Sequence, residues 1–523
     1  MGNAAALLSA QSFKRTWAQL QAKEQLPPSP SGKPAHNILF VTSEITDLVK
    51  VGGLGDVSAA LPRALAEHHQ VRILIPGYRQ VVRSGWPIRV VGKLPGLGAI
   101  PPCLIGEITL PDKLIVHVVL CQQLYDREGN PYVDSEGNDW PDTHIRFARL
   151  ALAASRIAAG QGVRGWRPDL VHAHDWPTGL TPAYMAWSGQ STPCIFTIHN
   201  LAYQGLCSAE SLVELGLPDE AMSAAGMEYY GDLSFLKAGI NYATRITTVS
   251  QTYAHEITSQ AYGCGLEGLL RRKASEGLLS GHVNGIDSSW DPREDPRLVQ
   301  GFAPNQWQGK RANMRYVERS FGLTEEEGPL FAVVSRLVHQ KGIDLTIAAA
   351  ETIVAEGGRI AIIGEGERPL EREVEALTRR YPGRIGVKLS FCETEARRII
   401  AGSDFLLMPS RYEPCGLSQS YAQCYGSLPI ARRTGGLADT IEDGVSGFLF
   451  REPTLDSYLQ AIRRALGVYR RPVLLNAMRC KAMAAPLYWH QSVKPYDRLY
   501  RRLIEGTYDA FSTHGRRTLA CAN

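Results

Sequence analysis

Two cationic side chains stand close together in the second half of the 523-residue chain. Arg336 and Lys341 lie in the segment SRLVHQK, which begins where the apolar run LFAVVS ends, and Gly342 follows them. A guanidinium fork and a mobile ammonium group at the end of one strand form a clamp suited to a diphosphate. Solvated surface charge is the alternative interpretation of this segment taken alone.

Two histidine clusters also follow short apolar runs. HAHDW contains His174 and Asp175, and TIHN contains His199 and Asn200. Because the carboxyl ends of parallel strands meet at one edge of a sheet, we expect all four side chains to face the same cleft. A single histidine at a strand end is more often structural, but two clusters on neighbouring strand ends favour a site.

A glycine-rich turn, KVGGLGDV, lies between the first expected strand and the first expected helix. Glycines let a backbone approach a ligand closely, and the N-terminus of the following helix presents unpaired N–H groups to an anion. We expect a phosphate or a sugar hydroxyl to bind here, with a simple turn as the alternative. The segment matches neither the GxGxxG fingerprint nor a P-loop.

The segment SRYEPCGLSQSYAQCYG leads from a strand into a helix and places Glu413 at the mouth of the expected cleft. Gly416, Leu417 and Ser418 would begin the helix with exposed N–H groups, which favours an anion. Further on, RRTGGLADT repeats a glycine pair at the entrance to a helix. A glycine pair alone is a weak signal, but it adds to several such segments along the chain.

A scaffold of two similar sheets would position these motifs. Apolar runs such as NILFVTS, LVHAH, CIFTIH and RITTVS alternate with helical patterns in the first half, and LFAVVS, RIAIIG, DFLLMPS and LPIA do so in the second. Continuous apolar strands separated by helices are typical of parallel sheets that are buried on both faces. The predicted fold class is therefore α/β, with two doubly wound Rossmann-like domains facing a central cleft.

The expected domain organisation has five parts. They are an N-terminal extension and linker at 1–36, an N-terminal domain at 37–290, a linker at 291–312, a C-terminal domain at 313–490, and a C-terminal helix and tail at 491–523 that packs back on the first domain. The extension has one acidic residue and contains PPSPSGKP, which is typical of a linker. A transit peptide is the alternative, and a secretory signal is disfavoured because no charged segment precedes AAALLSA.

Composition excludes several classes of function. The net charge of +4 is spread through the chain without dense basic blocks, so nucleic-acid and membrane partners are not expected. No apolar run is long enough for a transmembrane helix. The ten cysteines are scattered and form no CxxC pair, which fits a reducing compartment and a cytoplasmic location, with a plastid as the alternative if 1–36 is part of a transit peptide.

The motifs together resemble one family. KVGGLGDV, LYDREGNPY, HAHDW, TIHNLAYQG, FLKAGI, VNGID, VVSRLVHQKGIDL, PSRYEPCGL and RRTGGLADT occur in this order between residue 37 and about residue 505. The chain thus resembles the bacterial glycogen synthases, which are related to plant starch synthases and have the two-domain GT-B architecture. The resemblance implies retaining transfer of glucose from ADP-glucose to the non-reducing 4-hydroxyl of an α-1,4-glucan, with UDP-glucose as the alternative donor.

The resemblance also implies roles for single residues. The catalytic set would be Lys50, Asp175, His199, Arg336, Lys341 and Glu413. The donor would contact Lys50, Gly53, Asp56, Asn284, Phe391, Cys415, Gly416, Leu417 and Ser418, and the acceptor would contact Tyr132 and Asp175. Arg336 and Lys341 would bind the phosphates and have the largest catalytic share, because they bind the leaving diphosphate more tightly as its charge grows.

No carboxylate pair of the kind that retaining glycosidases use can be assigned. The wider GT-B group often has a second glutamate eight residues after the first, and here that position is Tyr421. The hypothesis is that the acceptor hydroxyl attacks from the face that the phosphate leaves, with the phosphate taking the proton. No metal and no cofactor are expected, because Arg, Lys and helix ends meet the phosphate charge, and the two domains should close over the donor.

Three departures from the family pattern stand out. Phe391 replaces a tyrosine that stacks on the base, the segment after LADT lacks an insertion, and the N-terminal extension has no counterpart. Two rival functions remain open. One is a retaining GT-B transferase with a small sugar acceptor, and the other is a catalytically silent glucan-binding relative. The sequence does not fix the oligomeric state.

Overall fold

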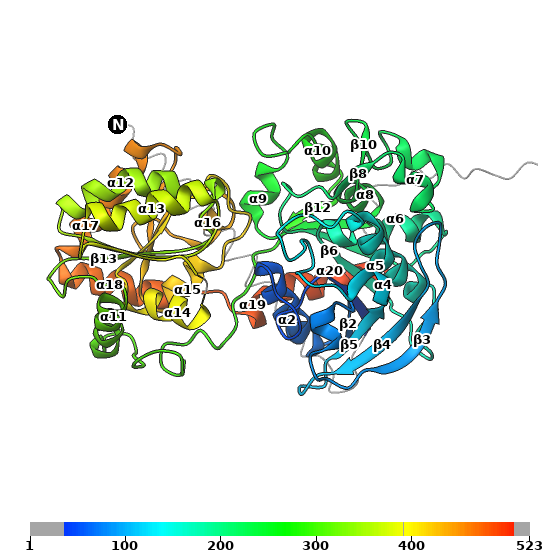
Figure 1. Cartoon of the computed structure of the whole chain (residues 1–523), viewed down its shortest axis with the longest axis horizontal. Helices are drawn as coiled ribbons and strands as arrows, with labels where there is room; N and C mark the ends of the chain where they lie inside the picture. Colours follow the sequence, from blue (N-terminus) through cyan, green and yellow to red (C-terminus); the bar gives the residue numbers. More distant parts are fainter. Residues whose placement is uncertain (1–35, 391, 507–523) are drawn as a thin grey trace, which may run out of the picture. The chain divides into compact units, whose positions relative to one another are not determined.

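The computed structural model describes residues 36–390 and 392–506, which form two α/β lobes (Figure 1). The N-lobe surrounds a hydrophobic core that draws on residues 38–270 and 489–503. The C-lobe surrounds two cores whose residues lie between 286 and 488. The predicted pair of doubly wound lobes is confirmed by the order and direction of their strands.

The N-lobe is built on a nine-stranded sheet in the order β12-β11-β7-β6-β1-β2-β5-β4-β3. The strands are β1 Asn37–Val41, β2 Gln70–Pro76, β3 Arg89–Leu94, β4 Cys103–Thr109, β5 Ile115–Leu120, β6 Leu170–His174, β7 Cys194–Ile198, β11 Arg245–Thr248 and β12 Leu279–Gly281. All pairs from β12 to β5 are parallel. Every residue of β6 and β7 is buried, as expected for central strands covered on both faces.

Helices and a small second sheet complete this lobe. The α-helices are α2 Gly53–Ala66, α3 Arg79–Val82, α4 Gln122–Tyr125, α5 Thr143–Ala158, α6 Leu180–Trp187, α7 Ser211–Glu214, α8 Phe235–Tyr242, α9 Gln251–Glu256, α10 Glu267–Ser275, α19 Trp489–Ser492 and α20 Lys494–Ile504. The second sheet consists of β8 Leu206–Ser208, β10 Asp232–Ser234 and β9 Glu228–Tyr229. This sheet and the antiparallel edge of β4 and β3 were not expected from the sequence.

The C-lobe has a six-stranded parallel sheet in the order β15-β14-β13-β16-β17-β18. Its strands are β13 Leu330–Val334, β14 Arg359–Ile363, β15 Ile385–Lys388, β16 Phe405–Met408, β17 Leu428–Arg432 and β18 Phe448–Phe450. Its helices are α11 Gln308–Ser320, α12 Ile343–Ala355, α13 Arg368–Arg380, α14 Glu393–Gly402, α15 Ser418–Cys424, α16 Gly435–Thr440, α17 Leu455–Tyr469 and α18 Pro472–Met483.

Alternate residues of β13 enter different cores, which shows how the sheet is covered on both faces. Phe331 and Val333 belong to the core that includes α12, α13 and α17. Leu330 and Ala332 belong to the core that includes α11 and α14. Figure 1 shows α12, α13 and α17 along one face of this sheet and α11 and α14 along the other.

The predicted linker at 291–312 is part of the C-lobe and not a free connection. Trp290, just before it, stacks on Tyr421 with ring centroids 3.6 Å apart. The buried Asp295 carboxylate pairs with Arg397 at 2.9 Å, and α11 already begins at residue 308. The Pro- and Trp-rich composition that indicated a linker instead fills a hydrophobic core.

The C-terminal helix α20 packs on the N-lobe. Asp497 accepts a hydrogen bond from Nε2 of His69 at 2.8 Å, and the Tyr500 hydroxyl lies 2.5 Å from Nδ1 of His172 on β6. Tyr496 and Tyr500 are part of the N-lobe core. The chain therefore crosses between the lobes twice, once before residue 286 and once after residue 483.

None of the helices in the part of the chain that the structure describes is both long enough and apolar enough to cross a membrane.

Candidate active site

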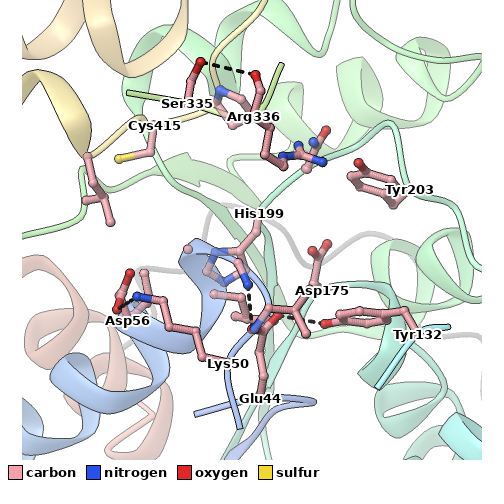
Figure 2. Close-up of a pocket in the computed structure, with 18 of the residues that line it drawn as sticks. Glu44, Lys50, Asp56, Tyr132, Asp175, His199, Tyr203, Ser335, Arg336 and Cys415 are labelled. Atoms are coloured by element: carbon pink, nitrogen blue, oxygen red, sulfur yellow. Dashed lines mark hydrogen bonds and ion pairs between the residues drawn. The ribbon is translucent and has the colours of Figure 1, made fainter. Parts of the chain in front are cut away.

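The carboxyl ends of the central strands of both lobes open into one cleft of about 2400 Å³. Figure 2 shows Arg336 and Cys415 on one side of this pocket and Lys50, His199 and Asp175 on the other. The predicted site residues that line it are Lys50, Gly53, Asp56, Tyr132, Asp175, His199, Asn284, Arg336, Lys341, Glu413, Cys415, Gly416, Leu417 and Ser418. Phe391 lies outside the described residues.

The glycine-rich turn before α2 is held by a residue that sequence reasoning missed. The buried Glu44 accepts hydrogen bonds through Oε2 from the backbone N–H groups of Val51, at 2.6 Å, and Gly52, at 2.9 Å. Its Oε1 accepts the hydroxyl hydrogen bond of Tyr132 at 2.9 Å. Charge-assisted bonds of this kind fix the turn at the cleft wall. The available signal was an acidic residue three positions after the first strand.

Tyr132 lines the cleft, but its hydroxyl group already has hydrogen-bond partners. Besides Glu44 it contacts Oγ of Ser43 at 2.9 Å. Burial, together with the nearby Glu44 carboxylate, raises the pKa of Tyr132 well above its usual value. A bound sugar would therefore not find a free hydroxyl group at Tyr132.

Lys50 and Asp56 form an ion pair on the N-lobe side of the cleft. Nζ of Lys50 lies 2.6 Å from Oδ1 of Asp56, and each side chain is 33% exposed. Thr46 donates its hydroxyl hydrogen bond to the same oxygen at 3.0 Å. Because Asp56 lies in the first turn of α2, the pair tethers the mobile ammonium group to a helix that begins at the cleft.

Asp175 has a strained backbone at the end of β6. Its φ of 59° and ψ of 176° lie in a region that is populated essentially by glycine and costs about 1–3 kcal/mol for other residues. Its N–H donates to the Thr197 carbonyl at 2.8 Å, and its carbonyl accepts from Thr178, which holds the strained conformation in place. This backbone conformation sets the direction of the Asp175 side chain, which lines the cleft.

The Asp175 carboxyl group is buried, and this burial raises its pKa to about 7. Backbone N–H groups of Trp176, Asn200 and His199 oppose the shift without cancelling it. Its Oδ1 has no hydrogen-bond partner among the described residues. Burial thus favours the protonated form of this carboxyl group more than in water, and one oxygen is left for a ligand.

The structure separates the two histidines that were expected to face the cleft together. His199 lines the cleft, whereas His174 is fully buried behind it. Nδ1 of His174 lies 3.0 Å from Nε2 of His199. Burial lowers the pKa of His199 to about 3, and it also lowers the pKa of His174 well below its usual value, so both rings are neutral at pH 7.

On the C-lobe side, Glu413 holds Lys341 at the end of the turn after β13. Oε2 of Glu413 lies 2.6 Å from Nζ of Lys341 and accepts the Ser410 hydroxyl hydrogen bond at 3.0 Å. The Glu413 side chain is only 7% exposed, so these two partners offset part of the cost of burying it. Arg336 is exposed, and its guanidinium makes no hydrogen bond or ion pair with the described residues. The Arg336 fork is therefore available to an anion.

The wall beside Glu413 depends on close backbone packing. Burial raises the pKa of Cys415 to about 12, so this side chain stays a neutral thiol. A Cβ atom at Gly435 would come 1.9 Å from the Glu413 carbonyl oxygen, and one at Gly436 would come 2.0 Å from that of Cys415. The glycine pair of RRTGGLADT is therefore needed for α16 to support the 413–415 loop.

The N-terminus of α16, expected to bind an anionic ligand, instead binds a side chain of the N-lobe. Glu256, at the end of α9, accepts hydrogen bonds from the Thr434 hydroxyl at 2.9 Å and from the Gly435 N–H at 3.1 Å. In return Asp439 of α16 accepts from the N–H groups of Gln251 and Thr252, at 2.7 and 3.0 Å. Each helix thus caps the other, and this reciprocal cap joins the lobes beside the cleft.

Asn284 enters the cleft between the two lobes. Its side chain is buried, and Oδ1 has no hydrogen-bond partner among the described residues. A buried amide oxygen without a partner costs about 1–3 kcal/mol. A hydroxyl group of a ligand would relieve that cost.

Within the described ranges, 36–390 and 392–506, no three His, Cys, Asp or Glu side chains are grouped so that they could hold a metal ion.

Comparison with known proteins identifies both lobes. Residues 37–272 match the starch synthase catalytic domain, and residues 317–470 match the glycosyl transferases group 1. A glycogen synthase of Pseudomonas aeruginosa is 65% identical over 473 residues, which are 90% of this chain and 92% of that protein. A glycogen synthase of Pseudomonas syringae pv. syringae is 61% identical over 477 residues, or 91% of this chain and 98% of that protein.

Solved structures agree with these matches. The catalytic domain of starch synthase IV from Arabidopsis thaliana, bound to ADP and acarbose, superposes with a TM-score of 0.79 at 29% identity and covers 90% of this chain and 99% of that one. Sucrose-phosphate synthase from Thermosynechococcus elongatus, with a TM-score of 0.56 at 17% identity, shares the GT-B fold alone. The chain belongs to the glycogen synthase family of glycosyltransferases.

Proposed function

We propose that this protein transfers glucose from ADP-glucose to the non-reducing 4-hydroxyl of an α-1,4-glucan, with retention of anomeric configuration. The observation that carries the proposal is the placement of Arg336 and Lys341 in one cleft with Lys50 and His199. Cations from one lobe can then bind a diphosphate whose sugar is held partly by the other lobe. The glycogen synthases that it resembles and the ADP-bound starch synthase structure support this choice of donor and acceptor.

In the proposed mechanism the chain stabilises the leaving group and not a covalent intermediate. Negative charge grows on the diphosphate as the bond to C1 breaks, so Arg336 and Lys341 bind the transition state more tightly than the ground state. To hold the phosphate, Lys341 must share its ammonium group between the ligand and Glu413. The departing phosphate then takes the proton of the acceptor hydroxyl that attacks from the same face.

Asp175 and Glu413 do not form a nucleophile and acid pair in this proposal. Glu413 is bound to Lys341 and Ser410, which suits it to accept hydrogen bonds from sugar hydroxyls. Asp175, with its pKa near 7, can accept or donate a hydrogen bond to the incoming glucan without placing a full negative charge in the cleft. Mass-spectrometric trapping of a glucosyl-enzyme would contradict this assignment.

We further propose that the reaction needs no metal and no cofactor, and that the protein acts in the cytoplasm. Arg336, Lys341 and backbone N–H groups supply the charge that a metal would otherwise provide. The nine cysteines in the described ranges are all free thiols, which supports a reducing compartment, with a plastid as the alternative. Activity should therefore survive EDTA, and a loss that a divalent ion restores would overturn the metal-free proposal.

A donor panel tests the proposed function. Purified protein is given ADP-, UDP- or GDP-glucose with glycogen as primer, and both nucleotide release and glucose incorporation into precipitable glucan are measured. We expect incorporation to be fastest with ADP-glucose and Arg336→Gln to reduce it by about 10²- to 10³-fold. Transfer to a small sugar alone would favour the small-acceptor transferase, and glycogen binding without ADP release would favour a silent relative.

A further inference from the structure

A chain of buried polar side chains runs from α20 to the cleft. The Tyr500 hydroxyl contacts Nδ1 of His172, and Nε2 of His172 contacts Oγ1 of Thr197 at 2.6 Å. Next to His172 on the same face of β6 lies His174, with ring centroids 3.9 Å apart. His174 in turn contacts His199, which lines the cleft. The ring of His199 is therefore supported from behind by a second imidazole.

The surroundings of His174 restrict where its proton can lie. Its ring is stacked on Phe40, at 3.9 Å between centroids, and also packs against the ring of His172. Nε2 of His174 is buried and has no hydrogen-bond partner among the described residues. Buried N–H groups without an acceptor are rarer in proteins than acceptors without a donor. The neutral ring of His174 therefore carries its proton on Nδ1, the nitrogen that faces His199.

We infer that His174 is a positioning residue that donates its Nδ1 hydrogen to Nε2 of His199 and so fixes the proton of His199 on Nδ1. The opposite arrangement would place a proton on Nε2 of His199 and leave His174 with an unpaired buried N–H. Nδ1 of His199 has no hydrogen-bond partner among the described residues, so its N–H is available to an acceptor oxygen in the cleft. Under the proposed function, on which this last step rests, that oxygen belongs to the glucose being transferred.

This arrangement also gives His199 the charge that the reaction needs. A sugar that loses its diphosphate becomes positively charged around C1, and a protonated imidazole next to it would oppose that charge. A doubly protonated His199 would need His174 to accept a hydrogen bond through Nδ1, and His174 would then carry its own proton at the unpartnered Nε2. The network thus favours a neutral His199 that donates a hydrogen bond through Nδ1, in agreement with the low pKa of His199.

Three substitutions of His174 test the kinetic part of this inference. His174→Asn keeps an amide N–H close to the position of Nδ1, whereas His174→Gln moves it one bond further out, and His174→Phe fills the space without a donor. We expect kcat to fall by about 10-fold in His174→Phe and His174→Gln and to stay within about 3-fold of wild type in His174→Asn. The KM for glycogen should change by less than about 2-fold, since the acceptor does not touch this hydrogen bond. Equal kcat values in all three variants would overturn the inference.

The position of the proton can be measured without any substrate. Side-chain ¹⁵N shifts of uniformly labelled wild-type protein, with the His199 signals identified by their loss in His199→Asn, distinguish a protonated Nδ1 from a protonated Nε2. We expect His199 to show a protonated Nδ1 at pH 7. A protonated Nε2 overturns the inference even if every His174 variant fails to fold. A protonated Nδ1 in a protein that does not use ADP-glucose would leave this inference standing and refute the proposed donor.

Discussion

Replacing Lys341 by methionine removes the cation of the Lys341–Glu413 pair while keeping most of the side-chain volume. The charged atoms lie 2.6 Å apart, and the side chains are 20% and 7% exposed. At an effective dielectric constant of about 20, their attraction is about 6 kcal/mol, of which desolvation of the two groups offsets a large part. Because the Ser410 hydrogen bond to Glu413 remains, we expect a net loss of about 2–3 kcal/mol in the free energy of unfolding.

That loss should lower the Tm by about 4–8 °C in scanning calorimetry. Initial rates of ADP release at saturating ADP-glucose and glycogen should fall by about 10²- to 10³-fold, because a preorganised cation is missing from the leaving diphosphate. Adding Glu413→Gln to Lys341→Met removes the unpaired buried charge. The double variant should therefore regain most of the lost Tm but none of the lost rate.

A control on the same lobe is Arg464→Met, which breaks the more exposed pair with Asp443 at 2.7 Å. Surface pairs contribute about 0–1 kcal/mol, so the Tm should change by less than about 3 °C and the rate should not change. Two results would refute the reasoning. One is a kcat within about 3-fold of wild type in Lys341→Met, and the other is a double variant that is less stable than Lys341→Met.

Two further predictions concern the N-lobe and the contact between the lobes. The pKa of Asp175 in the folded protein, about 7, is above the reference value of 3.8, so the wild type loses stability relative to Asp175→Asn as the pH rises from about 4 to 7. The difference in unfolding free energy should grow by at most about 4 kcal/mol over this range in denaturant titrations, and a difference that is independent of pH would contradict the buried carboxyl group. Asp439→Asn weakens the cap of α9, which rests on three hydrogen bonds. Amide hydrogen exchange at Thr252 should speed up by about 5-fold, as expected for a loss of about 1 kcal/mol, whereas Asp443→Asn should leave it unchanged. Unchanged exchange in Asp439→Asn would show that the reciprocal cap does not hold α9.

Much of the fold could be predicted because the central strands have the mostly apolar composition that their buried position in the sheet requires. LVHAH and CIFTIH are short runs rich in apolar residues, as expected of strands buried on both faces, and Leu170–His174 and Cys194–Ile198 are fully buried strands in the structure. The residues that follow such strands are close together for a geometric reason, since parallel strands end at one edge. For this reason Asp175 and His199 could be expected in one cleft before any coordinates were known.

The remaining features depend on contacts between distant segments. Nothing local in TSEITD shows that Glu44 accepts hydrogen bonds from the glycine-rich turn, and nothing in QTYAHEI shows that Glu256 fills the N-terminus of α16. The segment at 291–312 has the composition of a linker, yet Asp295 finds Arg397 about a hundred residues later and becomes part of the core. Tertiary packing overrides local composition at such positions, and only the folded chain reveals the partner.

The return of α20 to the N-lobe affects how the protein can be made. His69 and Asp497 are 428 residues apart, and His172 and Tyr500 are 328 apart. A ribosome releases the N-terminal end first, so a nascent N-lobe must keep part of its apolar surface uncovered while the whole C-lobe is synthesised. The C-lobe can fold as it emerges from the ribosome. The N-lobe can complete its fold only when α20 has been synthesised, close to the end of translation. A premature stop codon just before α20 would leave Arg336 and Lys341 in the chain. The N-lobe would still expose apolar surface and would be prone to aggregate.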